Sequence, residues 1–296
     1  MLIAAEGRLC IHKSWTDKRS SLHRTVSRQN SRTQAPALSV GSYYSNQGSS
    51  SPSLKPSSAI YCLAASKGGA VNPPELKARE QLPRLAVFVS GGGSNLRAIH
   101  AAILNRQIQA EVAVVVSDVP HCGGCQYAVE HGIATLAYPA SSKTLVNGRQ
   151  LGVTTEKLID SLSRQFEVDY VLLAGYLKLI PEELLRVYKR AMLNIHPALL
   201  PNFGGKGFYG SKVHQAVIKS GARFSGPTVH FVDEGYDTGP ILAQAVVPVS
   251  PTDTAVQLAA RVLQEEHSLY PYAVSALVDG RITWRPDGVP ILWTAS

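Results

Sequence analysis

From Leu85 onward the chain alternates short apolar runs of strand length with stretches whose apolar residues have helical spacing. The runs predict strands at Leu85–Val89, Val112–Val116, Thr135–Tyr138, Tyr170–Ala174, a segment ending at His196, Thr228–Val232, Ile241–Val247 and Arg281–Trp284. The spacing predicts helices at Asn95–Asn105, Gly124–His131, Thr155–Phe166, from Pro181 onward, at Lys212–Lys219 and at Thr254–Leu269. Such alternation predicts an α/β fold: a doubly wound, mostly parallel sheet with helices on both faces.

Three segments of the chain directly follow predicted strands. They are Gly91–Asn95, Gly175–Ile180 and Asn194–Pro197. Ligands of open α/β sheets bind beyond the carboxyl ends of the strands. We therefore expect the three segments to meet in one crevice.

Asn194 and His196 lie two residues apart at the end of a predicted buried strand, so both side chains should face the same side. An amide that donates a hydrogen bond and an imidazole that carries a proton suit a reaction in which a carbonyl becomes an oxyanion. Asp237 lies in a turn-prone loop, and its carboxylate could pair with His196, raising the imidazole pKa and fixing the ring. The alternatives stay open: His196 as a core histidine, and Asp237 as a turn former.

The first predicted strand is followed by a glycine loop and a helix. Backbone amides of Gly93, Ser94 and Asn95 at such a helix start favour a phosphate group. The pattern is neither GxGxxG nor a Walker loop, which argues against a dinucleotide or a nucleoside triphosphate. A simple turn closing the βα unit remains the alternative. The loop Gly175–Ile180 has apolar side chains and available backbone groups, which suit a flat heteroaromatic ligand; an ordinary connection between strand and helix is the alternative.

Composition and charge separate a leader from the rest of the chain. Residues 1–60 hold eight of the 29 Lys and Arg but two of the 21 Asp and Glu, so +6 of the net charge of +8 lies there. This distribution argues against a nucleic-acid binder. A Ser- and Arg-rich leader without an apolar core is typical of an organelle transit peptide, with a disordered regulatory tail as the alternative. We expect a disordered transit peptide at 1–63, a linker at 64–83 and a catalytic domain at 84–296.

Apolar runs and cysteines limit the class further. No run approaches the roughly 18 apolar residues of a membrane span, so a soluble protein is expected. Four cysteines, with Cys10 and Cys62 in the leader, do not suggest a disulfide framework. Cys122 and Cys125 form one CxxC without a second pair for zinc. Small residues in a tight loop are the favoured interpretation, and a redox role stays open.

Four motifs occur in order between Arg84 and Trp284: Gly-Gly-Gly-Ser-Asn-Leu, Ala-Gly-Tyr-Leu-Lys-Leu-Ile, Asn-Ile-His-Pro-Ala-Leu-Leu-Pro and Val-His-Phe-Val-Asp-Glu-Gly-Tyr-Asp-Thr-Gly-Pro. With them the chain resembles the phosphoribosylglycinamide formyltransferase family of purine synthesis, in its organelle-targeted plant form. The resemblance implies the formyltransferase fold, with a Rossmann-like N-terminal half. It implies transfer of a formyl group from 10-formyltetrahydrofolate to the amine of 5′-phosphoribosylglycinamide.

The resemblance also implies roles for individual residues. The catalytic set would be Asn194, His196 and Asp237, with His196 as general acid/base. Gly93, Ser94, Asn95 and Glu266 would bind the substrate phosphate. The folate would contact Leu177, Lys178, Leu179, Ile180, Asn194, His230 and, through its tail, Lys143, while the loop 233–237 helps to hold its pteridine. The glycine-rich stretch Gly204–Gly210 is longer than the family pattern leads us to expect.

The expected partners are two small molecules, the ribonucleotide and the formyl-folate, with no metal, nucleic acid or membrane, in a monomer or homodimer. A plastid location is expected, with the mitochondrion as the alternative. Rival functions are a formyltetrahydrofolate hydrolase, a methionyl-tRNA formyltransferase and a catalytically silent folate binder. The hydrolase would usually carry a regulatory domain before this fold, and the tRNA enzyme a basic C-terminal extension.

Overall fold

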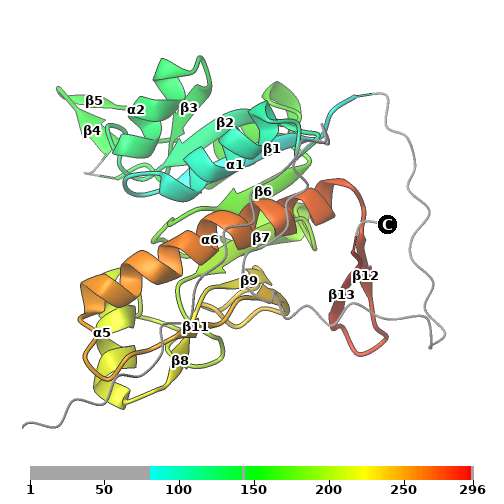
Figure 1. The fold of residues 1–296 in the computed structure, drawn as a ribbon. Helices are drawn as coiled ribbons and strands as arrows, with labels where there is room; N and C mark the ends of the chain where they lie inside the picture. Colours follow the sequence, from blue (N-terminus) through cyan, green and yellow to red (C-terminus); the bar gives the residue numbers. More distant parts are fainter. Residues whose placement is uncertain (1–80, 142–143, 295–296) are drawn as a thin grey trace, which may run out of the picture. The chain divides into compact units, whose positions relative to one another are not determined.

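A computed structural model describes residues 81–141 and 144–294 of the 296-residue chain. Its centre is a seven-stranded sheet in the order β10-β9-β7-β6-β1-β2-β3 (Figure 1). The strands are β1 (Arg84–Val89), β2 (Glu111–Ser117), β3 (Ala134–Ala137), β6 (Tyr170–Leu173), β7 (Met192–His196), β9 (Thr228–Phe231) and β10 (Ile241–Gln244). Neighbours from β3 to β7 pair in parallel, and β9 is antiparallel to β7 and β10. The predicted mostly parallel sheet is confirmed.

Helices cover both faces of this sheet, as predicted. They are α1 (Ser94–Leu104), α2 (Gly123–Glu130), α3 (Thr155–Asp160), which continues as a π-helical turn at Ser161–Gln165, α4 (Glu182–Val187), α5 (Ser211–Ser220) and α6 (Ala255–Val278). A hydrophobic core lies on each face of the sheet, and alternate residues of β1 point into one or the other. Leu85, Val87 and Val89 pack with α1, α2 and α6. Ala86 and Phe88 pack with α3 and α4. Burial on both faces explains why the strands are continuous apolar runs.

Three short strand pairs lie outside the main sheet: β4 (Leu145–Val146) with β5 (Arg149–Gln150), β8 (Phe224–Ser225) with β11 (Val247–Pro248), and β12 (Ile282–Trp284) with β13 (Pro290–Leu292). The stretch between the strand predicted at Thr135–Tyr138 and the helix predicted at Thr155–Phe166 therefore contains a small hairpin. The strand expected at Ile241–Val247 was wrong in extent. Its end leaves the main sheet because Val247 pairs with Ser225 instead of extending β10.

The last helix, α6, is longer than predicted. We expected it to end near Leu269 because proline removes a backbone donor and disfavours a helical residue before it. The helix instead continues through Pro271 to Val278. Tyr270 is fully buried, and its hydroxyl lies 3.1 Å from the Leu173 carbonyl oxygen and 3.0 Å from that of Leu193. Burial of the turns after Pro271 outweighs the local cost of the proline.

Several sequence predictions fall outside the described residues. They are the transit peptide at 1–63, nearly all of the linker at 64–83, and the folate-tail contact Lys143. Within the described part of the chain, none of the helices combines the length and apolar character that crossing a membrane requires.

Candidate active site

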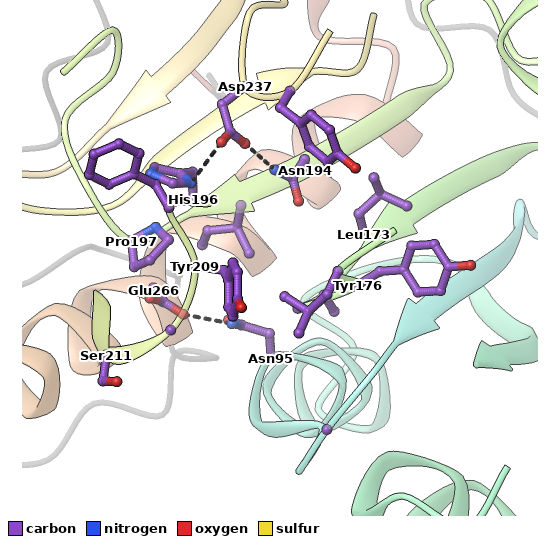
Figure 2. Close-up of a pocket in the computed structure, with 18 of the residues that line it drawn as sticks. Asn95, Leu173, Tyr176, Asn194, His196, Pro197, Tyr209, Ser211, Asp237 and Glu266 are labelled. Carbon is purple, nitrogen blue, oxygen red and sulfur yellow. Dashed lines mark hydrogen bonds and ion pairs between the residues drawn. The ribbon is translucent and has the colours of Figure 1, made fainter. Parts of the chain in front are cut away.

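A cavity of about 830 Å³ opens at the carboxyl ends of the parallel strands. All three segments predicted to meet, Gly91–Asn95, Gly175–Ile180 and Asn194–Pro197, contribute to its lining. Its remaining walls come mainly from the arm 205–211, the start of α5, the loop after β9 and the first half of α6. Figure 2 shows Asn194, His196 and Asp237 gathered at one side, with Asn95 and Glu266 at another. The volume lies within the range of about 300–1,000 Å³ typical of small-molecule sites.

Strand β7 places Asn194 and His196 on the cavity side. The strand is held between β6 and β9, and Asn194 lies opposite Leu173 on one side and His230 on the other. The residue between them, Ile195, packs into the core cluster that contains α6. Strand alternation therefore brings the amide and the imidazole to one face, as the spacing predicted.

Asp237 contacts both Asn194 and His196. Its Oδ2 lies 3.4 Å from His196 Nδ1, and its Oδ1 accepts a hydrogen bond of 3.4 Å from Asn194 Nδ2 (Figure 2). The amide of Gly205 donates to Oδ2 at 2.9 Å. Asp237 has a φ of 57°, in the left-handed region that Asp tolerates better than most residues. The turn-forming and functional interpretations of Asp237 therefore describe the same conformation.

Gly204 makes room for this contact. A Cβ atom at Gly204 would lie 2.5 Å from Leu200 Cδ2 and 3.2 Å from Asp237 Cβ. A larger residue would push the arm away from the carboxylate, so the glycine-rich sequence has a steric cause at this position.

His196 is buried, with 4% of its surface exposed. Its Nδ1 faces Asp237, and its Nε2 lies 2.9 Å from the Phe203 carbonyl oxygen. Burial lowers the pKa of His196, and Asp237 and the Phe203 carbonyl oppose that shift without overcoming it. Asp237 raises the pKa of His196, as predicted, but desolvation outweighs this attraction, so the net pKa is lowered.

The Asp237 carboxyl shows the converse balance. Burial raises its pKa, but the neighbouring His230 and His196 and the Gly205 amide lower it by more, and the net pKa is lowered. Asp237 is therefore ionised at neutral pH. An anion beside a buried imidazole stabilises the ring when it gains a proton.

His230 contacts the side-chain amide of Asn194. Its Nδ1 lies 2.8 Å from the Phe231 carbonyl oxygen, which requires a proton on Nδ1. Its Nε2 then accepts from Asn194 Nδ2 at 3.0 Å. His230 lines the cavity, but both ring nitrogens are engaged by protein groups. The geometry therefore suits positioning of Asn194 better than the predicted contact with a folate.

The glycine loop forms another wall of the cavity. Gly93 has a φ of 74° and directly precedes α1, so the helix begins at the cavity. The Asn95 side chain donates to Glu266 Oε2 at 2.7 Å, which fixes loop and α6 together (Figure 2). Burial raises the pKa of Glu266, and the Asn95 hydrogen bond opposes this only in part.

The loop after β6 supplies an apolar wall. Leu177 and Leu179 are 51% and 46% exposed, unusual for leucines, and Ile180 is buried. Leu177, Lys178, Leu179 and Ile180 all line the cavity, as do Asp233 and Tyr236 of the loop after β9. Exposed leucines around a cavity indicate an apolar ligand surface. The structure thus brings together every predicted site residue that it describes, and Lys143 lies outside the described residues.

Sequence reasoning missed the contribution of the arm 205–211 and of α5. Lys206, Phe208 and Tyr209 line the cavity, and so does His214, which is 5% exposed. His214 Nδ1 is buried without a hydrogen-bond partner among the described residues. The arm could not be predicted because its glycine-rich sequence has no hydrophobic periodicity. The length of Gly204–Gly210 was the one available signal.

Comparison with known proteins identifies relatives across this whole region. Residues 83–274 match the family described as Formyl transferase. The chain is 54% identical to "Phosphoribosylglycinamide formyltransferase, chloroplastic" of Vigna unguiculata over 79% of this chain and 74% of the relative. It is 48% identical to the Arabidopsis thaliana protein of the same description, over 81% and 79%. The crystal structure of phosphoribosylglycinamide formyltransferase from Anaplasma phagocytophilum superposes with a TM-score of 0.62 at 31% identity, covering 72% of this chain and 94% of that one.

Proposed function

The chain belongs to the formyl transferase family, and from this premise we propose how its site carries out formyl transfer. The reaction is the glycinamide ribonucleotide transformylation of purine biosynthesis, in which the amine of 5′-phosphoribosylglycinamide receives a formyl group. The relatives named chloroplastic place the protein in the plastid. A formyl-folate is the co-substrate that the family implies, and we propose 10-formyltetrahydrofolate specifically.

One observation carries the assignment of catalytic roles: Asn194 and His196 each contact Asp237 beside a cavity whose walls differ in chemistry. Helix α1 begins at one wall, where backbone amides favour an anion. Leucines of the loop after β6 form another, which favours an apolar ring. A phosphorylated amine and a folate bound at these two walls would place their reacting atoms near the three polar side chains.

We assign the substrate phosphate to Gly93, Ser94 and Asn95. A carboxylate repels a phosphate, so Glu266 acts through Asn95, whose amide it orients at 2.7 Å. Burial raises the pKa of Glu266, so this carboxyl takes up a proton more readily than an exposed one. The folate ring is assigned to Leu177–Ile180 and the loop 233–237.

The substrate amine attacks the formyl carbon, and the carbonyl oxygen takes up the electron pair as an oxyanion. Asn194 and protonated His196 stabilise this oxygen, and Asp237 supports the charge on His196. The nitrogen–carbon bond to the folate then breaks, and the proton lost by the amine reaches the folate nitrogen directly or through water. No metal is needed in this scheme.

The resting hydrogen bonds set two requirements for this mechanism. Both hydrogens of Asn194 Nδ2 are engaged, so donation to an oxyanion replaces the longer bond, 3.4 Å to Asp237. His196 Nε2 must likewise exchange the Phe203 carbonyl for a reacting atom or a water molecule. Substrate binding therefore has to shift Phe203 and, with it, the arm 205–211 that follows.

The test is an assay of purified protein with 10-formyltetrahydrofolate and glycinamide ribonucleotide. We expect formylglycinamide ribonucleotide as the product, and a loss of about 10²–10⁴-fold in kcat for His196→Ala. Release of free formate without transfer would instead identify a hydrolase. Absence of both products would identify a catalytically silent folate binder.

A further inference from the structure

Two cysteines that do not line the cavity lie at the start of α2. Cys122 directly precedes the helix, and Cys125 lies in its first turn. Both are buried free thiols, with 9% and 4% of their surfaces exposed. Cys122 is thus the more accessible of the two. Residues three apart across a helix start come within the roughly 4.4–6.8 Å between Cα atoms that a disulfide needs.

The two thiols have unequal environments. Ser117 Oγ lies 3.4 Å from Cys122 Sγ, and Cys125 Sγ lies 3.9 Å from the Val119 carbonyl oxygen, so the single Cys125 S–H can point to that carbonyl or turn to an ionised Cys122. The hydrogen bond from Cys125 lowers the pKa of Cys122 to about 5, against the opposing effect of burial, with further help from Ser117 and the helix amides. The same interaction, followed by burial, raises the pKa of Cys125. Cys122 is therefore the more acidic and the more nucleophilic of the two thiols.

The two glycines between the cysteines have a packing reason. A Cβ atom at Gly123 would lie 3.2 Å from Gly92 Cα, and one at Gly93 would lie 2.7 Å from Gly124 Cα. The Gly124 amide also donates to the Gly91 carbonyl oxygen at 3.0 Å. The first turn of α2 is thus in backbone contact with the loop Gly91–Gly93. Contact with the loop accounts for the glycines but not for the two cysteines.

We propose that Cys122 and Cys125 form a reversible disulfide, and that this modification changes the grip of the glycine loop on the substrate phosphate. Closing the bond draws the two sulfurs together around Gly123 and Gly124, the residues in contact with the loop. The effect on catalysis rests on the proposed phosphate role of Gly93–Asn95. The thiol chemistry stands independently of that role.

The oxidant is an external disulfide, either a protein dithiol in its oxidised form or a small oxidised dithiol. The Cys122 thiolate attacks one sulfur of that disulfide, forming a mixed disulfide and expelling the other sulfur as a thiolate. Cys125 then loses its proton and attacks Cys122 Sγ, and the second external sulfur leaves. One external disulfide becomes two thiols, and the two protein thiols become one disulfide. Excess dithiol reverses both steps.

The first measurement follows the thiols. The full chain with Cys10→Ser and Cys62→Ser, which keeps Cys122 and Cys125, is equilibrated in buffers of reduced and oxidised dithiothreitol. Acid quenching, alkylation and mass spectrometry should show a single two-electron transition from two labelled thiols to none. Peptide mapping should place the bond between Cys122 and Cys125. Thiols that stay reduced at every ratio would overturn the proposal.

The second measurement compares the steady-state kinetics of the fully reduced enzyme with those of the fully oxidised enzyme. Oxidation should raise KM for glycinamide ribonucleotide about tenfold, equivalent to about 1.4 kcal/mol, and leave KM for the formyl-folate within about twofold. Addition of reduced dithiothreitol should return KM for glycinamide ribonucleotide to its value in the reduced enzyme. In the same background, Cys125→Ser and, separately, Cys122→Ala should keep the KM of the reduced enzyme and lose its response to oxidant. A disulfide that forms with both KM values unchanged would refute the control of the phosphate loop.

Failure of the proposed function is visible separately. An enzyme that makes no formylglycinamide ribonucleotide even when fully reduced would contradict the catalytic assignment, whatever the state of the cysteines.

Discussion

At the scale of single residues, Asp237 contacts both of the other residues proposed to be catalytic. It contacts His196 at 3.4 Å, Asn194 at 3.4 Å and the Gly205 amide at 2.9 Å. Removal of its charge would leave the buried imidazole without its neighbouring anion. Burial already lowers the pKa of His196, so the ring depends on Asp237 whenever it carries a proton.

Asp237→Asn should therefore change both the rate and its pH dependence. The amide keeps the shape of the side chain but no longer raises the pKa of His196, which falls further below its ordinary value. If protonated His196 is the active form, kcat decreases as pH rises through this pKa, so the decrease should begin at lower pH in the variant. We expect kcat at neutral pH to fall about 10²–10³-fold with little change in either KM. An unchanged pH profile would remove Asp237 from the mechanism.

Two adjacent glycines offer a matched pair of variants. A Cβ at Gly93 would lie 2.7 Å from Gly124 Cα, and its φ of 74° is unfavourable for alanine, whereas a Cβ at Gly92 meets nothing within 4 Å. Gly93→Ala should raise KM for glycinamide ribonucleotide by about tenfold or more. Gly92→Ala should leave it within about twofold. Equal KM values for the two variants would show that the conformation at Gly93 does not matter for phosphate binding.

At the scale of elements, sequence patterns predicted the central strands well because β1 and β6 are continuous apolar runs buried on both sides. The same reasoning failed for α6, which continues through Pro271 because Tyr270 and the turns after it are buried. Such tertiary burial has no local signal. The arm after Phe203 was missed for a related reason, since its glycines carry no pattern and its contact with Asp237 is made by a backbone amide.

Tyr270→Phe tests what α6 contributes to the site. The hydroxyl contacts the carbonyl oxygens of Leu173 and Leu193, the residue before Asn194. Loss of this buried hydrogen bond should lower the free energy of unfolding by about 1–2 kcal/mol. Urea denaturation measures this change, and kcat should stay within about threefold. A stability equal to that of wild type would show that the hydroxyl does not hold α6 to the sheet.

At the scale of the whole molecule, the sequence predicted the meeting of distant segments because strand ends in a parallel sheet share one edge. It did not predict the net pKa of His196, since that depends on how deeply the ring is buried once the fold is complete. The uneven distribution of charge also belongs to this scale, with +6 of the total +8 in residues 1–60.

Deletion of residues 1–63 should leave catalysis intact while abolishing import into isolated plastids, because the cavity-lining residues that the structure describes lie between Gly91 and Glu266. We expect kcat and both KM values within about twofold of the full chain. A loss of activity that accompanies a correctly folded product would assign the leader a role beyond targeting.

The most direct test of the central claim is a double-mutant cycle on single-turnover formyl transfer with His196→Ala, Asp237→Asn and the combined variant. If the two side chains act as one unit, the combined variant should lose about as much rate as His196→Ala alone. Losses that multiply, so that the combined defect equals the product of the two single defects, would contradict a shared role for His196 and Asp237 at the reacting carbon.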